Sequence, residues 1–146
     1  MKIYTIGYTK KSAEEFFGAL EEHGIERVVD IRLKNTSQLA GFTKKQDLEY
    51  FLHRISGIEY CHLDFLAPSA ELMKGYKESG EDWDLYVREF SKLLSERQVL
   101  DKLDRQSFSE KRSCLLCSEP EADHCHRRLV AEHLKEAWSE VEIVHL

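Results

Sequence analysis

The chain has 146 residues and a net charge of −6, with 42% hydrophobic and 33% charged residues. These values indicate a soluble, globular, single-domain protein (residues 1–146) and argue against a general binder of polyanions. No apolar run approaches the roughly 20 residues that a membrane span needs, and no signal peptide is visible. We therefore expect a cytoplasmic protein with no membrane partner, and its four cysteines favour metal or thiol chemistry over a disulfide scaffold.

Five short segments are typical of β-strands because they are apolar or alternate between apolar and polar residues. They span residues 2–6, 27–31, 58–63, 114–117 and 141–145. Most of the sequence between these segments carries helical periodicity, so strands and helices alternate along the chain. This alternation predicts an α/β, three-layer, Rossmann-like domain with a mostly parallel sheet of about five strands.

Capping residues mark the first two helices. Ser12 and Glu15 form a capping box, and Thr43 and Gln46 repeat that pattern before the second helix. Gly57 is the expected end of the second helix. The residues that this helix is expected to bury are Leu48, Phe51, Leu52 and Ile55.

The middle of the chain is the least regular part. Ser69 could cap a short helix over residues 70–77, and a clear helical pattern begins at Trp83. Residues 95–104 either extend that helix or restart it. Residues 106–111 are expected to form a polar connector.

The expected fold directs attention to one edge of the sheet, because ligands of parallel sheets bind outside the carboxyl ends of the strands. The loops expected there are residues 7–11, residues 32–42, the segment after His62, and residues 117–123. The basic residues in or beside these loops are Lys10, Lys11, Arg32, Lys34, Lys44, Lys45, Arg127 and Arg128. An acidic protein would thus have one cationic edge, which suggests an anionic ligand, either a small molecule or a nucleic acid.

Residues 117–128 hold the densest chemistry of the chain, with two thiols, two imidazoles and two guanidinium groups. Asp123 is expected to be the N-cap of the helix that follows, which would place Cys125 in the first helical turn. The free amides of such a turn and the charge of Arg127 are expected to stabilise a Cys125 thiolate and lower its pKa. Cys114 is expected to be an inert core thiol.

Two of these thiols could share a site. Cys117 and Cys125 can converge, because a strand end and the start of the following helix are neighbours. With His126 they could hold a transition metal such as zinc and leave one coordination position open. Their spacing is not that of a zinc knuckle, and two buried small hydrophobic residues remain the plain alternative. Glu119 is a general base or a ligand, or it simply orders Arg127.

Five candidate binding residues lie outside that stretch, namely Gly7, Tyr8, Asp30, Arg32 and His62. Asp30 and Arg32 share one face of a strand. They form either an ion pair that shapes the loop or an anion clamp built on the planar guanidinium of Arg32. Tyr8 is a binding residue or a lid, and His62 ends the third strand.

Four short motifs follow one another along the chain, and they give it a resemblance to a known family. The motifs are Thr5-Ile6-Gly7-Tyr8, Val29-Asp30-Ile31-Arg32, Leu116-Cys117-Ser118-Glu119 and Cys125-His126-Arg127. With them the chain resembles the domain-of-unknown-function family 488, whose most specific element is the combination Cys-x-Glu and Cys-His-Arg. The family usually has a proline soon after the arginine of the second motif, where this chain has Leu33-Lys34-Asn35. The resemblance implies a shared site and leaves the reaction open.

Our hypothesis from the sequence is an enzyme that acts on a phosphate-bearing ligand, a nucleotide or a nucleic-acid component. Two alternatives stay open: a nucleic-acid-binding module without catalysis, and a thiol-based protein that binds or senses a metal. A phosphatase of the Cys-x5-Arg type is disfavoured, because neither candidate cysteine has an arginine six residues later. The residues assigned are Arg32 and Arg127 for the anion, Cys117 or Cys125 as nucleophile or metal ligand, and His126 or Glu119 for proton transfer.

Overall fold

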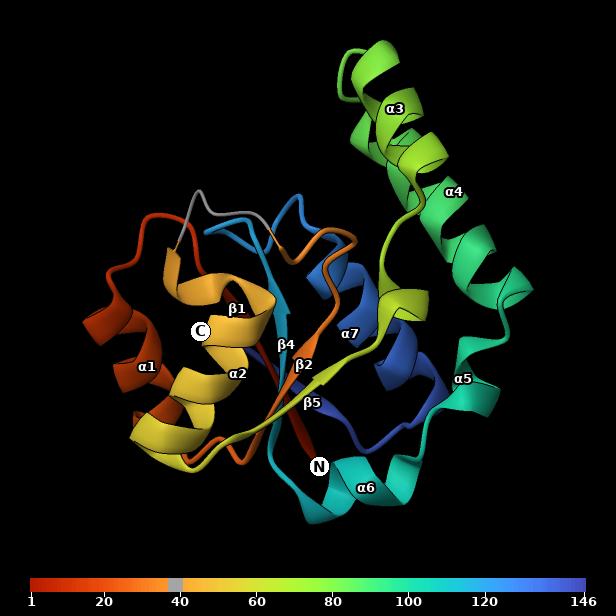
Figure 1. Ribbon diagram of the computed structural model, residues 1–146. Helices are drawn as coiled ribbons and strands as arrows, with labels where there is room; N and C mark the ends of the chain where they lie inside the picture. Colours follow the sequence, from red (N-terminus) through yellow and green to blue (C-terminus); the bar gives the residue numbers. More distant parts are fainter. Residues whose placement is uncertain (37–40) are drawn as a thin grey trace.

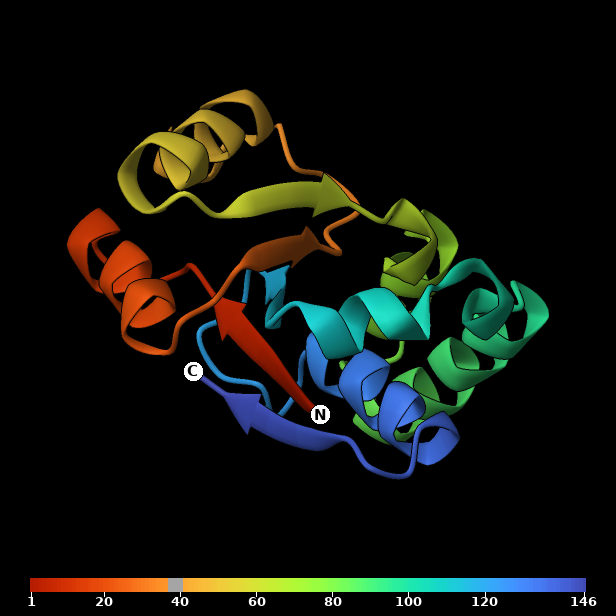
Figure 2. The same ribbon diagram turned by 90° about the horizontal axis from the view of Figure 1, so that it is seen from below.

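The computed structural model describes residues 1–36 and 41–146. Five parallel strands form one sheet in the order β3-β2-β4-β1-β5. The strands are β1 (Lys2–Gly7), β2 (Arg27–Asp30), β3 (Glu59–His62), β4 (Ser113–Cys117) and β5 (Glu142–His145). Helices cover both faces of the sheet (Figure 1 and Figure 2), which confirms the predicted three-layer, Rossmann-like α/β fold. Within the described residues, no helix has both the length and the apolar character that a bilayer crossing requires.

The two faces of the sheet carry separate hydrophobic clusters. Residues of β4 alternate between them, because Cys114 and Leu116 point to one face and Leu115 points to the other. The first face is covered by α1 (Ala13–Glu22) and α2 (Lys45–Phe51), as Figure 2 shows. The second face is covered by α4 (Trp83–Glu96), α5 (Val99–Lys102), α6 (Arg105–Glu110) and α7 (His126–Ala137).

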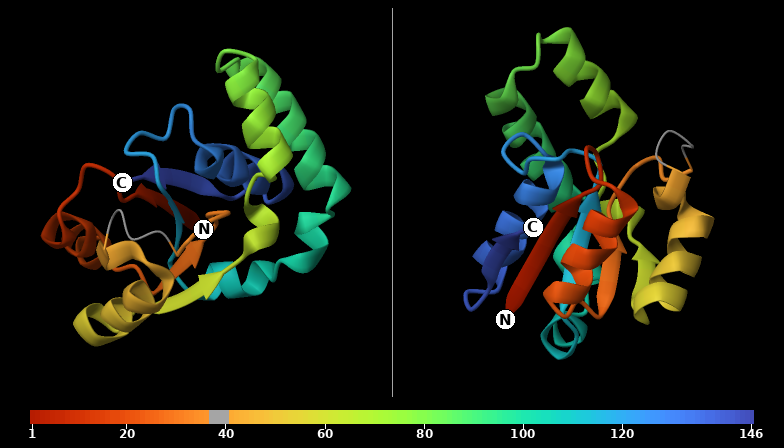
Figure 3. Two further views of the ribbon diagram at one scale, coloured as in Figure 1. Left: turned by 45° about the horizontal axis from the view of Figure 1, so that its top comes forward. Right: turned by 90° about the vertical axis from the view of Figure 1, so that its left-hand side faces the viewer.

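One helical hairpin stands above the carboxyl ends of the strands. It consists of α3 (Ala70–Glu78) and the first half of α4, and it projects from the body of the domain (Figure 1 and Figure 3). The Ser69 hydroxyl accepts a hydrogen bond from the backbone N–H of Leu72 at 3.0 Å, which confirms the expected N-cap. No residue of α3 is fully buried, but Leu72 and Tyr76 are partly buried against the core, and the Tyr76 ring lies edge-on to Tyr86 with 5.0 Å between ring centroids.

Strand order brings the loops of the site together. β4 lies between β1 and β2, with Cys117 beside Gly7 and Leu116 beside Asp30. The helix after β1 covers one face of the sheet and the helix after β4 covers the other. Adjacent strands whose connections leave toward opposite faces open a crevice between their carboxyl ends. The loops after β1, β2 and β4 therefore meet at one point.

The predicted start of the second helix is wrong. Thr43 belongs to a 3₁₀ turn (Gly41–Thr43), and the N-cap of α2 is Lys44, whose side chain makes no capping hydrogen bond. The first helical amide, that of Lys45, instead donates to the carbonyl oxygen of Asn35 at 2.7 Å. Tertiary contact thus replaces the local cap that the sequence suggested.

The helical segment ends at Gly57, as expected, but its last turn is not α-helical. Residues Leu52–Ser56 form a π-helical turn, which closes at Gly57 with a φ of 63°. The wider turn rotates Ile55 outward, so that its side chain is 55% exposed although the helical pattern predicted burial. The predicted loop from Arg32 to Phe42 is described in part, since residues 37–40 lie outside the described part of the chain.

The connector predicted over residues 106–111 is wrong as well, because α6 occupies most of it. Asp104 caps this helix by accepting a hydrogen bond from the backbone N–H of Gln106 at 3.0 Å. Phe108 is buried and packs against the ring of Trp138, with 5.5 Å between ring centroids. One cap and one buried aromatic residue suffice to form a short helix in a polar segment.

Residues 95–104 were expected either to extend the helix that begins at Trp83 or to start a new one. The structure shows a new helix, since α4 ends at Glu96 and α5 follows.

Candidate functional site

A cavity of about 590 Å³ lies at the carboxyl edge of the sheet, between the α3–α4 hairpin and the loops that follow β2 and β4. Its buried wall is formed by Cys117, Cys125 and His126. Tyr76 and Trp83 line it from the hairpin. The cavity therefore connects the reactive side chains of the sheet edge with solvent.

The two cysteines and the histidine form one compact cluster. The thiol of Cys125 donates a hydrogen bond to the sulfur of Cys117 across 3.0 Å, and Nδ1 of His126 lies 3.3 Å from the Cys117 sulfur. Nε2 of His126 lies 2.7 Å from the carbonyl oxygen of Ile31. A carbonyl can only accept, so Nε2 carries a hydrogen and Nδ1 faces the two sulfurs. The structure thus brings together the three residues that the sequence proposed as a group.

The electrostatics of the pair favour a thiolate at Cys117, whereas the sequence led us to expect one at Cys125. Burial disfavours a thiolate at Cys117, but the hydrogen bond from Cys125 and the backbone amides of Ser118 and Glu119 outweigh it and lower the pKa of Cys117. The same hydrogen bond to Cys117, together with burial, raises the pKa of Cys125. The prediction of a depressed Cys125 pKa is therefore wrong, and the stabilised thiolate is that of Cys117.

The reason lies in where α7 begins. The helix starts at His126 and its N-cap is Cys125, so Asp123 is not the N-cap. The backbone N–H of Cys125 donates to the carbonyl of Ala122 at 3.2 Å, in a turn that precedes the helix. Cys125 therefore lies before the free amides of the first helical turn instead of among them. The burial of Cys114, which raises its pKa, agrees with an inert core thiol.

Arg127 is buried, and its side chain holds the loop between β4 and α7 through hydrogen bonds. Its guanidinium donates to the carbonyl oxygens of Glu119 and Pro120 and to the hydroxyl of Thr5. It also lies 3.5 Å from the Cys125 sulfur, and the whole residue is 1% exposed. The guanidinium is thus engaged by the protein itself, and it orders the loop through the main chain of Glu119.

Asp30 and Arg32 form the ion pair that the sequence offered as one of two interpretations. Two guanidinium nitrogens of Arg32 donate to the two carboxylate oxygens of Asp30, each at 2.9 Å. Burial alone would raise the pKa of Asp30, but the hydrogen bond and charge of Arg32 outweigh it and hold that pKa below its ordinary value. Arg32 also donates to the carbonyl oxygen of Thr43 at 2.7 Å, and Tyr60 donates to Asp30 at 2.5 Å. Arg32 lines the cavity, but its charge is already balanced.

The remaining predicted residues lie around the site without lining the cavity, apart from Glu119, which is exposed at its mouth. The ring of Tyr8 lies against the guanidinium of Arg32, with 5.3 Å from the carbon to the ring centroid. His62 Nε2 lies 2.8 Å from the carbonyl oxygen of Arg32. Gly7 allows a close approach, because a Cβ there would lie 1.6 Å from the carbonyl oxygen of Glu119.

Sequence reasoning missed the contribution of α3. Met73, Lys74, Tyr76 and Lys77 of this helix all line the cavity. The sequence of α3 combines lysines with Tyr76 and Met73 and lacks a wide apolar stripe. This composition could have indicated a binding surface. The location of that surface could not be inferred, because it depends on how α3 folds back along α4.

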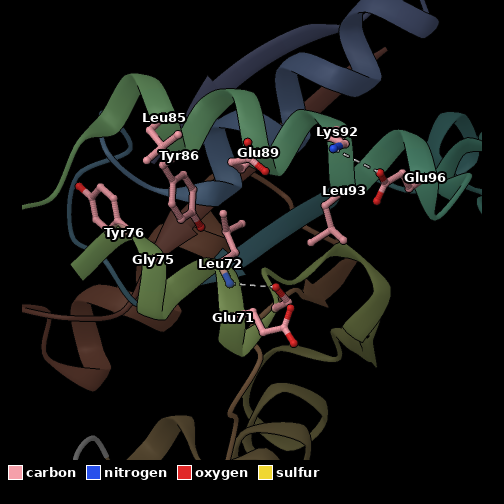
Figure 4. A pocket seen from close by; sticks show the side chains of 11 residues that line it. Glu71, Leu72, Gly75, Tyr76, Leu85, Tyr86, Glu89, Lys92, Leu93 and Glu96 are labelled. Carbon is pink, nitrogen blue, oxygen red and sulfur yellow. Dashed lines mark hydrogen bonds and ion pairs between the residues drawn. The ribbon is translucent and has the colours of Figure 1, made fainter. Parts of the chain in front are cut away.

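A second cavity, of about 420 Å³, lies between α3 and α4 (Figure 4). Tyr76 and Tyr86 line both cavities, and Leu72 and Leu93 project into the second one. Lys92 pairs with Glu96 at 3.9 Å on its rim. No cysteine or histidine is among its lining residues, so of these two cavities only the first has thiol and imidazole groups in its wall.

Comparison with known proteins agrees with the motifs. The model of the family described as "Domain of unknown function DUF488" matches residues 12–134, so the chain belongs to this family. The match confirms the resemblance and includes all of the Cys117–Arg127 region. Searches of curated proteins and of solved structures found no match.

Proposed function

We propose that this member of the DUF488 family is an enzyme that acts on a phosphate-bearing ligand, a nucleotide or a nucleic-acid component. The observation that carries the proposal is the cluster of Cys117, Cys125 and His126 in the wall of a 590 Å³ cavity. Thiols and an imidazole that are buried together, and yet reach a ligand-sized cavity, are the groups that nucleophilic or metal-assisted catalysis uses.

The charge of the cavity wall supports an anionic ligand. Lys34, Lys74 and Lys77 line it, against Glu81 and Glu119. Lysine ammonium groups on flexible stems suit phosphate as point charges. We assign the anion to these lysines in preference to the two arginines of the hypothesis, whose guanidinium groups are buried and bind protein acceptors. Lys74 pairs with Glu78 at 3.8 Å, but this pair is exposed and therefore weak.

The cluster would supply the reacting groups, either as a nucleophilic thiolate or through a bound metal ion. In both cases the loss of the Cys117 sulfur removes the chemistry. The proposal also favours a reducing compartment, such as the cytoplasm that the sequence predicts, because Cys117 and Cys125 must stay reduced.

The test is a search for turnover by ³¹P NMR. The purified protein is incubated with a set of nucleoside mono- and diphosphates, ribose 5-phosphate and a short oligonucleotide, and new phosphorus signals are recorded. We expect conversion of at least one compound by the wild type and by Cys61→Ser, since Cys61 lies in β3 and does not line the cavity. Cys117→Ser should lose that conversion. An unchanged spectrum for every compound, together with no detectable binding of any of them, would overturn the proposal.

A further inference from the structure

Three electron-pair donors converge at the buried wall of the cavity. The sulfur of Cys117 lies 3.0 Å from the sulfur of Cys125 and 3.3 Å from Nδ1 of His126. All three donor atoms lie within 4.8 Å of one another. A tetrahedral zinc ion bound at ordinary distances would separate two thiolate sulfurs by about 3.8 Å, and a sulfur from an imidazole nitrogen by about 3.6 Å. The two separations that involve the Cys117 sulfur therefore differ from those of a zinc site by less than about 1 Å, and the third, between Cys125 and His126, is at most 4.8 Å.

The orientation of His126 is fixed by the protein and leaves the correct atom free. Its Nε2–H donates to the carbonyl oxygen of Ile31 at 2.7 Å, and the edge-on contact with Phe90 has 5.9 Å between ring centroids. Metal-binding histidines usually donate their second ring N–H to a carbonyl or carboxylate in this way, which fixes the tautomer and the ring plane. The lone pair of Nδ1 consequently faces the two sulfurs.

A positively charged group lies beside the proposed ligands. Arg127 places a guanidinium nitrogen 3.5 Å from the Cys125 sulfur. Two thiolates and a divalent ion together are neutral, so the filled site would add no net charge to a buried position. Without an ion, the proton of Cys125 is shared with Cys117 over a contact of 3.0 Å between the two sulfurs.

We propose that Cys117, Cys125 and His126 bind one thiophilic metal ion, zinc being the best match, and leave its fourth coordination position open toward the cavity. Two cysteines, one histidine and an open position form one of the known donor sets of catalytic zinc, and a structural site would close the fourth position. The three ligands line the cavity, so the open position faces the space where a ligand enters. In the proposed enzyme the ion would hold a water molecule or a ligand oxygen there; only this last step rests on the proposed function.

The experiment measures metal content in protein purified without metal-affinity resin and under reducing conditions. Elemental mass spectrometry should find about one zinc per chain in the wild type and in Cys61→Ser, and a small fraction of that in Cys117→Ser and Cys125→Ser. Circular dichroism checks that each variant is folded. Metal-free wild type titrated with cobalt(II) should develop sulfur-to-cobalt charge-transfer bands and the strong visible bands of a tetrahedral site. This measurement uses the wild type, so it tests the proposal even if a variant fails to fold.

The contrary outcomes are equally concrete. Wild-type protein that contains no metal and shows no charge-transfer band with cobalt(II) would overturn the proposal. So would a Cys117–Cys125 disulfide in freshly purified, metal-free protein, which would identify a redox pair instead. If protein that contains no zinc and gives no charge-transfer band with cobalt(II) still converts a phosphate compound, the metal site fails and the proposed function stands. If the protein holds zinc but neither binds nor converts any such compound, the proposed function fails and the metal site stands.

Discussion

At Gly7, the main chain of Glu119 approaches so closely that no side chain fits. A Cβ at Gly7 would lie 1.6 Å from the carbonyl oxygen of Glu119 and 2.8 Å from the guanidinium of Arg127. We expect Gly7→Ala to displace the loop that begins at Ser118 and to lower the free energy of unfolding by at least about 2 kcal/mol, as overpacking does. Urea denaturation measures this change.

Gly18 provides the matched control. It lies inside α1, and a Cβ there meets nothing within 4 Å. Gly18→Ala should therefore leave stability unchanged or raise it by about 0.5–1 kcal/mol, because alanine favours a helix. Equal effects of the two substitutions would show that the close approach at Gly7 has no energetic weight.

Asp30 links the stability of the protein to pH. Its pKa in the folded state is held below the ordinary value of 3.8, after burial and the stronger opposing effect of Arg32 are combined. A depressed pKa contributes stability that is present above the unfolded pKa and is lost as the pH falls through the lower folded pKa. Asp30→Asn should cost about 3 kcal/mol at pH 7, because it leaves the buried guanidinium without its anion.

The measurement is the free energy of unfolding in urea between pH 7 and pH 3. The difference between wild type and Asp30→Asn should begin to narrow below the ordinary pKa of 3.8, because the unfolded wild type takes up a proton at Asp30 there before the folded protein does. Glu49→Gln, a change of an exposed carboxyl on α2, should stay within about 0.5 kcal/mol of the wild type throughout. A constant difference between wild type and Asp30→Asn at every pH would contradict the assignment.

Residue types predicted the site better than they predicted its electrostatics. The convergence of Cys117, Cys125 and His126 followed from strand-to-helix adjacency alone. The order of the two thiols did not, because it depends on a 3.0 Å contact and on a helix that starts at His126. Likewise, the pairing of Asp30 with Arg32 followed from their spacing, whereas the burial of Arg127 among carbonyl oxygens is a property of the folded loop.

At the scale of elements, removal of two serine N-caps should affect stability differently: one globally and the other locally. The Ser12 hydroxyl caps α1, which buries Phe16, Phe17 and Leu20 in the core. The Ser69 hydroxyl caps α3, which buries no residue. Ser12→Ala should therefore lower the global free energy of unfolding by about 1 kcal/mol.

Ser69→Ala should instead act mainly on α3, because this helix contacts the core only through partly buried side chains such as Leu72 and Tyr76. We expect its backbone amides to exchange with deuterium several-fold faster while exchange in the strands is unchanged. Hydrogen exchange followed by mass spectrometry resolves the two regions. Protection of α3 that changes only together with the strands would contradict the view that it opens independently.

Elements with a strong periodic pattern were predictable, and short elements held by tertiary contacts were not. The pattern from Trp83 predicted α4, and the capping box predicted α1. The polar segment that becomes α6 and the outward rotation of Ile55 depend on contacts distant in sequence. Local propensity is weak evidence where a single buried side chain decides the outcome.

For the molecule as a whole, the strand order explains why one edge carries the chemistry. The alternation of strands and helices predicted the layers and the edge, because parallel strands place their loops together. Neither the position of β4 between β1 and β2 nor the fold of α3 over the cavity could be deduced. The prediction of a single domain is not tested by these features and stays a prediction.

The central claim is that a phosphate-bearing ligand binds in the cavity beside Cys117, Cys125 and His126, and backbone NMR of the titrated protein tests it most directly. With adenosine monophosphate we expect the largest shifts at the amides of Ser118, Glu119 and His126. These shifts should weaken several-fold in Lys74→Ala/Lys77→Ala but not in the matched pair Lys92→Ala/Lys135→Ala, whose lysines do not line this cavity. Adenosine, which lacks the phosphate, should shift the same amides less. Shifts confined to the second cavity between α3 and α4, or equal shifts with adenosine, would contradict the account.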